Sequence, residues 1–272
     1  MIKSYASRGL TSISITVIDF CQLKCEYCFQ YSKTSSFLTK NKLDIILNQL
    51  RKIDQKMEII VMGGEPTLYP HLNYMLDELN KIENVKEILI FTNGIKLLDK
   101  IHFNSKVRLT FSYHYTQNNK NYIINNLKYL EKIKSPIYYD VNVMMVPNKK
   151  IDVSEFKKFC KVKPLYIETK HGTIYCNSCD ELFNLKEVDY DGEQLTYPEY
   201  IQKPRNFKGR RCFINEYIIE LNLNSENTCL KENIQIEHFA EYVNKYPFIL
   251  CPFEKCKKTR AGSLNIEWKK YY

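Results

Sequence analysis

The chain lacks long hydrophobic runs, is poor in glycine and has only five histidines in 272 residues. No stretch approaches the roughly 18 consecutive apolar residues of a transmembrane helix, so we expect no membrane span. The segment Met1–Asp19 has no continuous apolar core because Ser12, Ser14 and Thr16 interrupt it, which argues against a signal peptide. We therefore expect a cytoplasmic protein, in which thiols stay reduced and available to metal.

The cysteine content and the distribution of basic residues indicate neither a disulfide scaffold nor a nucleic-acid-binding protein. Ten cysteines fall well short of the density of a small disulfide scaffold. The formal net charge is +9, but local basic runs such as Arg210-Arg211 and the stretch from Lys255 to Lys258 are short. These runs are too short to indicate a nucleic-acid partner. With 44% hydrophobic residues, the chain is long enough to bury a substantial core.

Strand-like and helix-like segments alternate through the first two thirds of the chain. Alternating or continuous apolar residues predict strands at 13–17, 59–62, 88–91, 107–111, 141–146 and 165–167. Apolar residues at helical spacing predict helices at 43–53, 72–82, 123–133 and 153–159, with a weak helix at 95–101. Six β/α units predict the α/β fold class, as a partial (β/α)6 parallel barrel.

Three cysteines follow the first predicted strand on one short loop: Cys21, Cys25 and Cys28. Thiolates at this spacing can converge on a soft metal, and cysteine is the residue that holds iron–sulfur clusters. Three ligands, where a closed site would have four, leave one iron of a cubane open for a small molecule. The alternative is three unrelated buried cysteines or part of a zinc site.

Glycine is scarce, eight residues in all, yet three glycines follow predicted strands two and three: Gly63, Gly64 and Gly94. Glycine lets the backbone turn tightly or come close to a ligand. In a barrel of parallel strands, a ligand site lies at the carboxyl ends of the strands, where these glycines fall. The alternative for Gly63-Gly64 is an ordinary turn from strand to helix.

The pattern Cys-x3-Cys-x2-Cys, with Tyr27 before the last cysteine, resembles the signature of the radical S-adenosylmethionine (SAM) family. Gly63-Gly64-Glu65-Pro66 resembles the family's motif whose backbone binds the SAM amino group, and Thr92-Asn93-Gly94 resembles its turn after strand three. This resemblance covers about residues 10 to 170. It implies a [4Fe-4S] cluster at Cys21, Cys25 and Cys28, with SAM chelated through its amino and carboxylate groups at the open iron.

Polar residues at the ends of strands four and five are further site candidates. The resemblance implies that Ser112 lies near the ribose or carboxylate of SAM. Asn142 is polar in an otherwise apolar strand, and its burial without a partner would be costly, so we expect it to meet a ligand. His114 is the candidate catalytic residue because an imidazole exchanges protons near neutral pH. A structural, hydrogen-bonded histidine is the alternative.

Beyond Gly172 the composition changes. Six of the ten cysteines lie there: Cys176, Cys179, Cys212, Cys229, Cys251 and Cys256. We therefore predict two domains, a core barrel at 1–171 and a small cysteine-rich module at 172–272. Alternating apolar residues before the turn Asn224-Ser225 predict a β-hairpin in this module.

The hairpin and the cysteines after it resemble, more loosely, the auxiliary-cluster extensions called SPASM or, when shortened, twitch domains. The usual Asp-Gly turn is replaced by Asn-Ser, the glycine expected before the second cysteine is missing, and so is the terminal cysteine series. We interpret four cysteines as ligands of a second [4Fe-4S] cluster: Cys212, Cys229, Cys251 and Cys256. The alternative is a zinc site that recruits Cys176 and Cys179. Cys160, on a helical face with Phe156 and Phe159, is interpreted as a core residue.

The resemblance implies a radical SAM oxidoreductase that cleaves SAM to a 5′-deoxyadenosyl radical, which then abstracts a hydrogen from a substrate. It also implies a flavodoxin- or ferredoxin-type electron donor and, through the auxiliary cluster, a net oxidation. We expect a small polar metabolite as substrate, such as a sugar, aminocyclitol or nucleotide-linked sugar, because the predicted barrel begins near the N-terminus without an extra domain to grip a leader peptide. The alternatives are a peptide or protein maturase of the RiPP or sulfatase-maturase type, and a non-catalytic iron–sulfur or zinc protein.

Overall fold

The computed structural model describes residues 10–25, 28, 34–145, 151–166, 168–169, 172–173, 186–188, 194–196, 210–212, 216–227, 230–246, 249–250 and 266–270. Within this part of the chain, nine strands form one curved sheet in the order β14-β13-β12-β1-β2-β3-β4-β5-β6. The six strands of its parallel part are β1 (Thr11–Ile18), β2 (Met57–Gly63), β3 (Val85–Thr92), β4 (Val107–Tyr113), β5 (Tyr138–Met145) and β6 (Lys161–Tyr166). This arrangement confirms the predicted α/β fold with a mostly parallel sheet.

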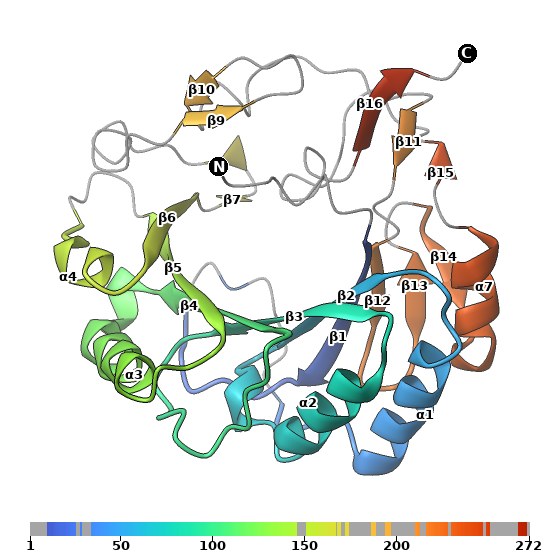
Figure 1. The fold of residues 1–272 in the computed structure, drawn as a ribbon, viewed down its shortest axis with the longest axis horizontal. Coiled ribbons are helices and arrows are strands. Elements are labelled where there is room, and N and C mark those ends of the chain that lie inside the picture. The colour runs from blue at the N-terminus through green and yellow to red at the C-terminus, as the bar shows by residue number, and fades with distance from the viewer. Residues whose placement is uncertain are drawn as a thin grey trace.

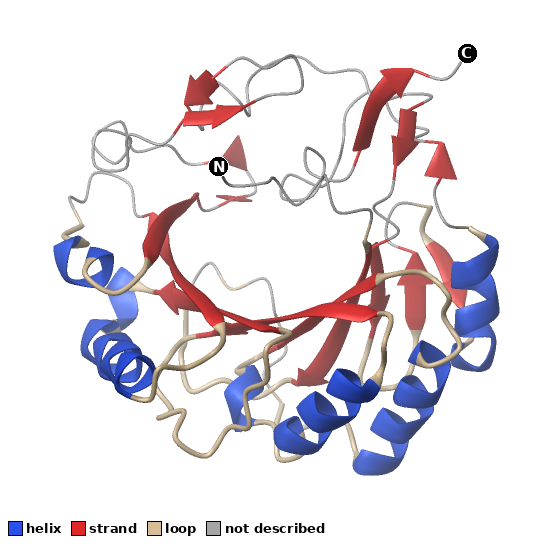
Figure 2. Cartoon of the chain, viewed as in Figure 1, coloured by secondary structure: helices blue, strands red, loops and turns tan. Residues whose placement is uncertain are grey.

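Helices connect the parallel strands except β3 and β4, which a loop joins, and they lie on the convex, outer side of the sheet (Figures 1 and 2). They are α1 (Lys40–Leu50), α2 (Leu72–Lys81), α3 (Lys120–Lys132) and the short α4 (Ser154–Lys157). Helix α1 begins where the sequence offers an N-cap, since the side chain of Thr39 accepts a hydrogen bond from the backbone N–H of Lys42. No helix among the described residues is long and apolar enough to cross a membrane.

Each strand sends alternate side chains to opposite faces of the sheet. On β4, Leu109 and Phe111 belong to the hydrophobic core that packs against the helices. The residues that alternate with them, Arg108 and Thr110, point to the concave face. The same alternation puts the apolar residues of β1 on the helix side and Ser12, Ser14 and Thr16 on the concave side.

The weak helix predicted at 95–101 is wrong, because the structure has a loop there. The loop is held by a buried side chain of α3: Asn126 accepts a hydrogen bond from the N–H of Leu98 and donates to the carbonyls of Gly94 and Lys96. These backbone groups are bound from outside the segment. An α-helix would have had to pair them internally.

The predicted hairpin is present, formed by β12 (Glu216–Ile219) and β13 (Ser225–Asn227). Its turn spans Glu220 to Asn224, and Leu223 takes a left-handed conformation with φ of 71°, so the turn lies earlier than the expected Asn224-Ser225. Strand β12 pairs in parallel with β1, and β14 (Glu232–Ile234) extends the sheet beyond β13. The hairpin therefore shares a sheet with the predicted barrel.

Helix α7 (Phe239–Lys245) follows β14 after the short helix η4 (Ile236–His238) and packs beside α1 (Figure 1). The side chain of Gln49 on α1 joins the two segments, donating to the carbonyl of Glu237 and accepting from the N–H of Ala240. Phe239 and Val243 enter the same core as the barrel helices.

Short strands outside the main sheet form three small sheets in the described part of the chain. These strands are β7 (Glu168–Thr169), β8 (Gly172–Thr173), β9 (Lys186–Val188), β10 (Gln194–Thr196), β11 (Arg210–Cys212), β15 (Ile249–Leu250) and β16 (Ile266–Lys270). The three sheets have the strand orders β10-β9, β15-β11-β16 and β7-β8. The division at 171/172 into two domains stays a prediction.

Candidate functional site

The cysteine loop begins at the carboxyl end of β1 and is fastened to the turn after β2. The backbone N–H of Gly64 donates to the carbonyl of Ile18 at 2.7 Å, and the N–H of Glu65 donates to the carbonyl of Phe20 at 2.8 Å. Cys21 follows directly. These bonds fix where the loop leaves the sheet.

Gly63 and Gly64 are required by this close approach. Gly63 has a φ of 132°, and a Cβ there would lie 2.2 Å from the carbonyl oxygen of Ile18. A Cβ on Gly64 would lie 2.2 Å from the carbonyl oxygen of Phe20. The glycines thus let two chain segments touch, so the predicted close approach is to the protein's own backbone at the start of the cysteine loop.

Glu65 joins the turns after β2 and β3 although its side chain is buried. Its Oε1 accepts hydrogen bonds from the N–H and hydroxyl of Thr67 and from the hydroxyl of Thr92, at 3.1, 2.6 and 2.7 Å. Its Oε2 accepts from the N–H of Asn93 at 2.7 Å. Burial raises the pKa of the Glu65 carboxyl, and these four hydrogen bonds oppose the rise. Pro66 follows as the first residue of the short helix η2 (Pro66–Leu68).

Asn93 connects the turn after β3 to the cysteine loop. Its Nδ2 lies 3.7 Å from the sulfur of Cys21 and 3.3 Å from Oε1 of Gln22. The amide group can donate to a thiolate at this place. Gly94, with φ of 70°, allows the chain to turn immediately afterwards, where a Cβ would meet the side chain of Ile123 at 2.8 Å.

His114 follows β4 and reaches the same loop. Its Nδ1 lies 3.6 Å from the sulfur of Cys25. The backbone is held by Asn119, which accepts from the N–H of His114 and donates to the carbonyls of Asn93 and Ser112. Sequence reasoning missed Asn119, which is fully buried and joins the ends of β3 and β4.

Ser112 and Asn142 lie side by side on neighbouring strands. They are register partners on β4 and β5, and both are partly exposed. Their alternation with core residues Phe111 and Val141 points both side chains to the concave face. The structure thus brings these two predicted residues together. Ser112 is the residue before Tyr113, where β4 ends.

Several predicted site residues lie outside the described part of the chain: Tyr27, Cys229, Cys251 and Cys256, together with Cys176 and Cys179 of the zinc alternative. Cys212 ends β11. Cys160 is half-buried, and burial raises the pKa of its thiol to about 12, which keeps it neutral and fits the predicted core role.

The cysteine loop offers three thiols, the donor group that holds iron–sulfur clusters. Cys21, Cys25 and Cys28 are all partly exposed, and the N–H of Cys28 donates to the carbonyl of Cys25 in a turn. In the part of the chain that the structure describes, no three His, Cys, Asp or Glu side chains are placed to hold one metal ion.

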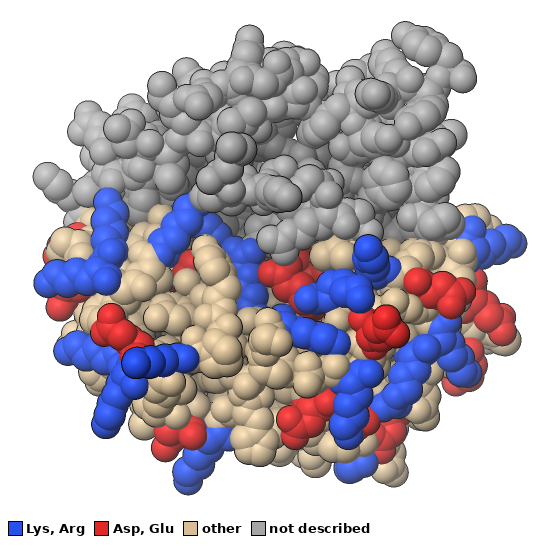
Figure 3. Space-filling view, in the orientation of Figure 1, with Lys and Arg blue, Asp and Glu red and all other residues tan. Residues whose placement is uncertain are grey.

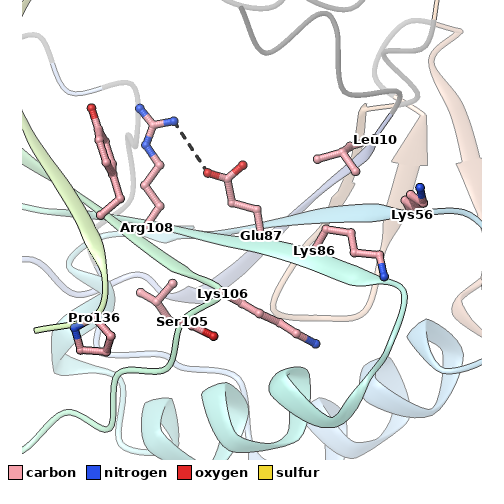
Figure 4. Close-up of a pocket in the computed structure, with 10 residues that line it drawn as sticks. Leu10, Lys56, Lys86, Glu87, Ser105, Lys106, Arg108 and Pro136 are labelled. Carbon is pink, nitrogen blue, oxygen red and sulfur yellow. Dashed lines mark ion pairs between the residues drawn. The ribbon is translucent and has the colours of Figure 1, made fainter. Parts of the chain in front are cut away.

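A separate cavity of about 480 Å³ lies at the other edge of the sheet, at the amino ends of β3 and β4 (Figure 4). Two of its three lysines bind backbone carbonyls: Lys106 donates to those of Asn80 and Ile82, and Lys86 donates to that of Glu83. On the molecular face shown in Figure 3, basic and acidic side chains are interspersed. That face therefore shows no single-sign surface for a nucleic acid.

Curated relatives match part of the chain. The GTP 3′,8-cyclase of Aquifex aeolicus (strain VF5) is 30% identical over 129 residues, which is 44% of this chain and 40% of that protein. The GTP 3′,8-cyclase of Clostridium perfringens (strain 13 / Type A) is 30% identical over 105 residues, 37% of this chain and 32% of that protein. The match thus spans less than half of the length of these relatives.

Solved structures share the fold over most of the chain. Native anSMEcpe with bound AdoMet and Cp18Cys peptide superposes with a TM-score of 0.57 at 16% identity, over 87% of this chain and 80% of that chain. Streptococcus suis SuiB bound to S-adenosylmethionine gives a TM-score of 0.55 at 14% identity, over 85% of this chain and 65% of that chain. At these identities the likeness shows the fold.

The family model described as the Radical SAM superfamily matches residues 15–160, a span that contains the cysteine loop, the Gly63–Pro66 segment, the end of β1 and the strands β2 to β5. This span is more than half of the chain, and it confirms the family predicted from the cysteine loop and the glycine turn. The chain therefore belongs to the radical SAM superfamily.

Proposed function

We propose that the protein is an enzyme that uses SAM to abstract a hydrogen from a small polar metabolite. Its family implies a [4Fe-4S] cluster and SAM, which together supply a 5′-deoxyadenosyl radical. Cys21, Cys25 and Cys28 would hold the cluster, and the backbone of Gly63–Pro66 would bind the SAM amino group. Ser112 and Asn142 would meet the rest of the cofactor from the concave face.

The polar concave face is the observation that favours a small polar substrate. Asn142 is partly exposed on the concave face, where an enclosed barrel would hold its ligand, and Ser14 and Thr110 lie buried on the same face. Polar groups there can hydrogen-bond hydroxyl or phosphate groups and hold one C–H bond beside the reactive group. The curated relatives named GTP 3′,8-cyclases support this class, since GTP is itself a small polar metabolite.

His114 is proposed as the catalytic residue that exchanges a proton with the substrate. Its place beside Cys25 supports a position at the site. Asn119 holds its backbone, so the ring is presented from a fixed point at the end of β4.

The auxiliary cluster and the net oxidation are the second part of the proposal. Cys212, Cys229, Cys251 and Cys256 would hold a second [4Fe-4S] cluster, able to accept the electron that a substrate radical loses. The electron for SAM cleavage would come from a flavodoxin- or ferredoxin-type donor. A product lighter than its substrate by two hydrogens supports the oxidation, whereas a product of unchanged mass supports a cyclisation or isomerisation.

The first experiment removes the three loop thiols. We expect the Cys21→Ala, Cys25→Ala, Cys28→Ala protein to form no 5′-deoxyadenosine from SAM under reducing, anaerobic conditions. Reconstituted wild-type protein should hold about eight irons and the triple variant about four, since each cubane contains four. Cys160→Ala is the matched control, because this half-buried thiol donates only to the carbonyl of Phe156, and it should keep both values. SAM cleavage by the triple variant would contradict the cluster assignment, and zinc with only four irons in the wild type would contradict the auxiliary cluster.

A further inference from the structure

Four charged side chains from neighbouring strands meet on the concave face, and we call them the charge network: Glu87, Arg108, Asp140 and Lys163. Arg108 on β4 donates from Nη2 to Oδ2 of Asp140 on β5 at 2.8 Å. Lys163 on β6 donates to the same oxygen at 2.5 Å. Glu87 on β3 lies 3.7 Å from Nη1 of Arg108, and Figure 4 shows these two side chains pointing toward each other.

Asp140 is the fixed centre of the network. Its side chain is fully buried, and its Oδ1 accepts a further hydrogen bond from the hydroxyl of Thr110 at 2.7 Å. Burial alone would raise the pKa of Asp140, but the charge of Lys163 and the hydrogen bonds from Lys163, Arg108 and Thr110 outweigh it and hold the pKa below its ordinary value. Asp140 is therefore a carboxylate that stays paired through Arg108 and Thr110 even if Lys163 turns elsewhere.

Lys163 is the member of the network that can exchange its partner. Its side chain is 28% exposed, against 10% for Arg108 and none for Asp140. A lysine has three donors on a flexible stem and binds anions as a point charge. The ammonium group can therefore keep Asp140 as one partner and take a second on its open side.

The position of Lys163 connects the network to the site. Lys163 is the register partner of Asn142, which is the register partner of Ser112, so the three form one row across β4, β5 and β6. The cysteine loop and the turns that contact it follow β1, β2 and β3. Lys163 lies two strands beyond Ser112 and three residues before the end of its own strand at Tyr166. Lys163 therefore lies in the same row as Ser112 and Asn142, below the carboxyl end of its own strand.

We propose that Lys163 binds an anionic group, a phosphate or a carboxylate, of the substrate. The inference rests on the proposed function and narrows it to metabolites that carry a negative charge. The row from Ser112 to Lys163 would then place the uncharged part of the substrate between Lys163 and the cofactor that Ser112 and Asn142 contact. Asp140 acts as a positioning residue, because it holds the ammonium group in the row.

The test uses inorganic phosphate as the probe and the full, anaerobically reconstituted chain. Isothermal titration should show phosphate binding by the wild type and binding weaker by about tenfold or more in Lys163→Met, because one hydrogen bond to a charged group is lost. Lys163→Arg keeps the charge and should recover part of the affinity. Lys120→Met is the matched control, since Lys120 on α3 is 22% exposed and its Nζ lies 2.8 Å from Glu155 on α4. The phosphate affinity of this variant should stay within about twofold of the wild type. Equal binding by wild type and Lys163→Met, or none by the wild type, overturns the proposal.

A second experiment tests whether Lys163 binds an anionic group of the substrate or the carboxylate of SAM. Phosphate binding that persists at saturating SAM supports a substrate subsite, whereas competition by SAM overturns it and assigns Lys163 to the cofactor. Acetylation of the wild type, read by mass spectrometry, needs no variant, and protection of Lys163 by phosphate is the expected result. The proposed function is contradicted by a different result, namely that the wild type forms no 5′-deoxyadenosine from SAM. Phosphate binding is measured without that assay, so the two failures can be distinguished.

Discussion

The convex face of the parallel sheet is almost entirely apolar, whereas the concave face carries polar and charged side chains on neighbouring strands. A single strand supplies both: Leu109 and Phe111 face the helices, and Arg108, Thr110 and Ser112 face the concave side. Burial in the convex layer stabilises the fold by roughly 25 cal/mol for each Å² of apolar surface removed from water. The concave layer buries charge, which is costly unless each group is paired. Side chains kept there in spite of this cost are the ones expected to meet a ligand.

The largest expected effect comes from the convex face. Phe111→Ala removes a fully buried ring and should lower the free energy of unfolding by about 3–5 kcal/mol. Ser112→Ala, the next residue on the opposite face, should change it by less than about 1 kcal/mol. Urea unfolding of both variants measures the difference. Equal losses in the free energy of unfolding would mean that the convex face does not contribute more to stability than the concave face.

An intermediate effect is expected from the centre of the charge network. Asp140→Asn leaves Arg108 and Lys163 without their shared counter-charge and should cost about 3 kcal/mol near neutral pH. Because the folded-state pKa of Asp140 is lowered below 3.8, its ionised form stabilises the wild type above that pH, and this contribution is lost as pH falls through the lower folded pKa.

The stability gap between wild type and Asp140→Asn should therefore narrow as urea unfolding is repeated from pH 5 downward. Asp54→Asn, an exposed position, is the control and should stay within about 0.5 kcal/mol of the wild type. A gap that stays constant down to the most acidic point would show that Asp140 is not the titrating group.

The smallest of the three effects is expected at Glu65, in the turn that follows β2. Glu65→Gln keeps the volume of the side chain but places an amide N–H₂ against the N–H of Asn93, where Oε2 now accepts. One lost hydrogen bond and two facing donors should cost about 1–3 kcal/mol in the free energy of unfolding. Glu131→Gln, on the exposed side of α3, should cost less than about 0.5 kcal/mol. If Glu65→Gln left the free energy of unfolding unchanged, the Glu65 carboxyl of the wild type would already be protonated and would donate a hydrogen bond.

The convex face could be predicted from the sequence, because its signal is local. Apolar spacing within α1, α2 and α3 and alternation within β1 and β4 each lie in a single short window. The failure at 95–101 has the same origin: Ile95, Leu98 and Ile101 have helical spacing, but Asn126, about thirty residues later, binds that backbone.

The charge network could not be predicted, because its members are far apart in the sequence and meet only through strand register. A single clue was present. Asp140 and Asn142 occupy alternate positions of an apolar strand, yet only Asn142 was identified as a site residue. The pairing of β12 with β1 likewise has no local pattern, which is why the hairpin was expected to lie apart from the barrel sheet.

That pairing has a consequence for how the chain reaches its native state. Strand β1 lies in the middle of the sheet, between β2 and β12, with Ser12 opposite Glu216. During synthesis, one edge of β1 therefore stays unsatisfied until some two hundred further residues have been made, and contacts of such high separation slow folding. A nascent chain would expose a template for strand addition throughout this interval. Chaperone dependence should then fall sharply once residues 216–227 have left the ribosome.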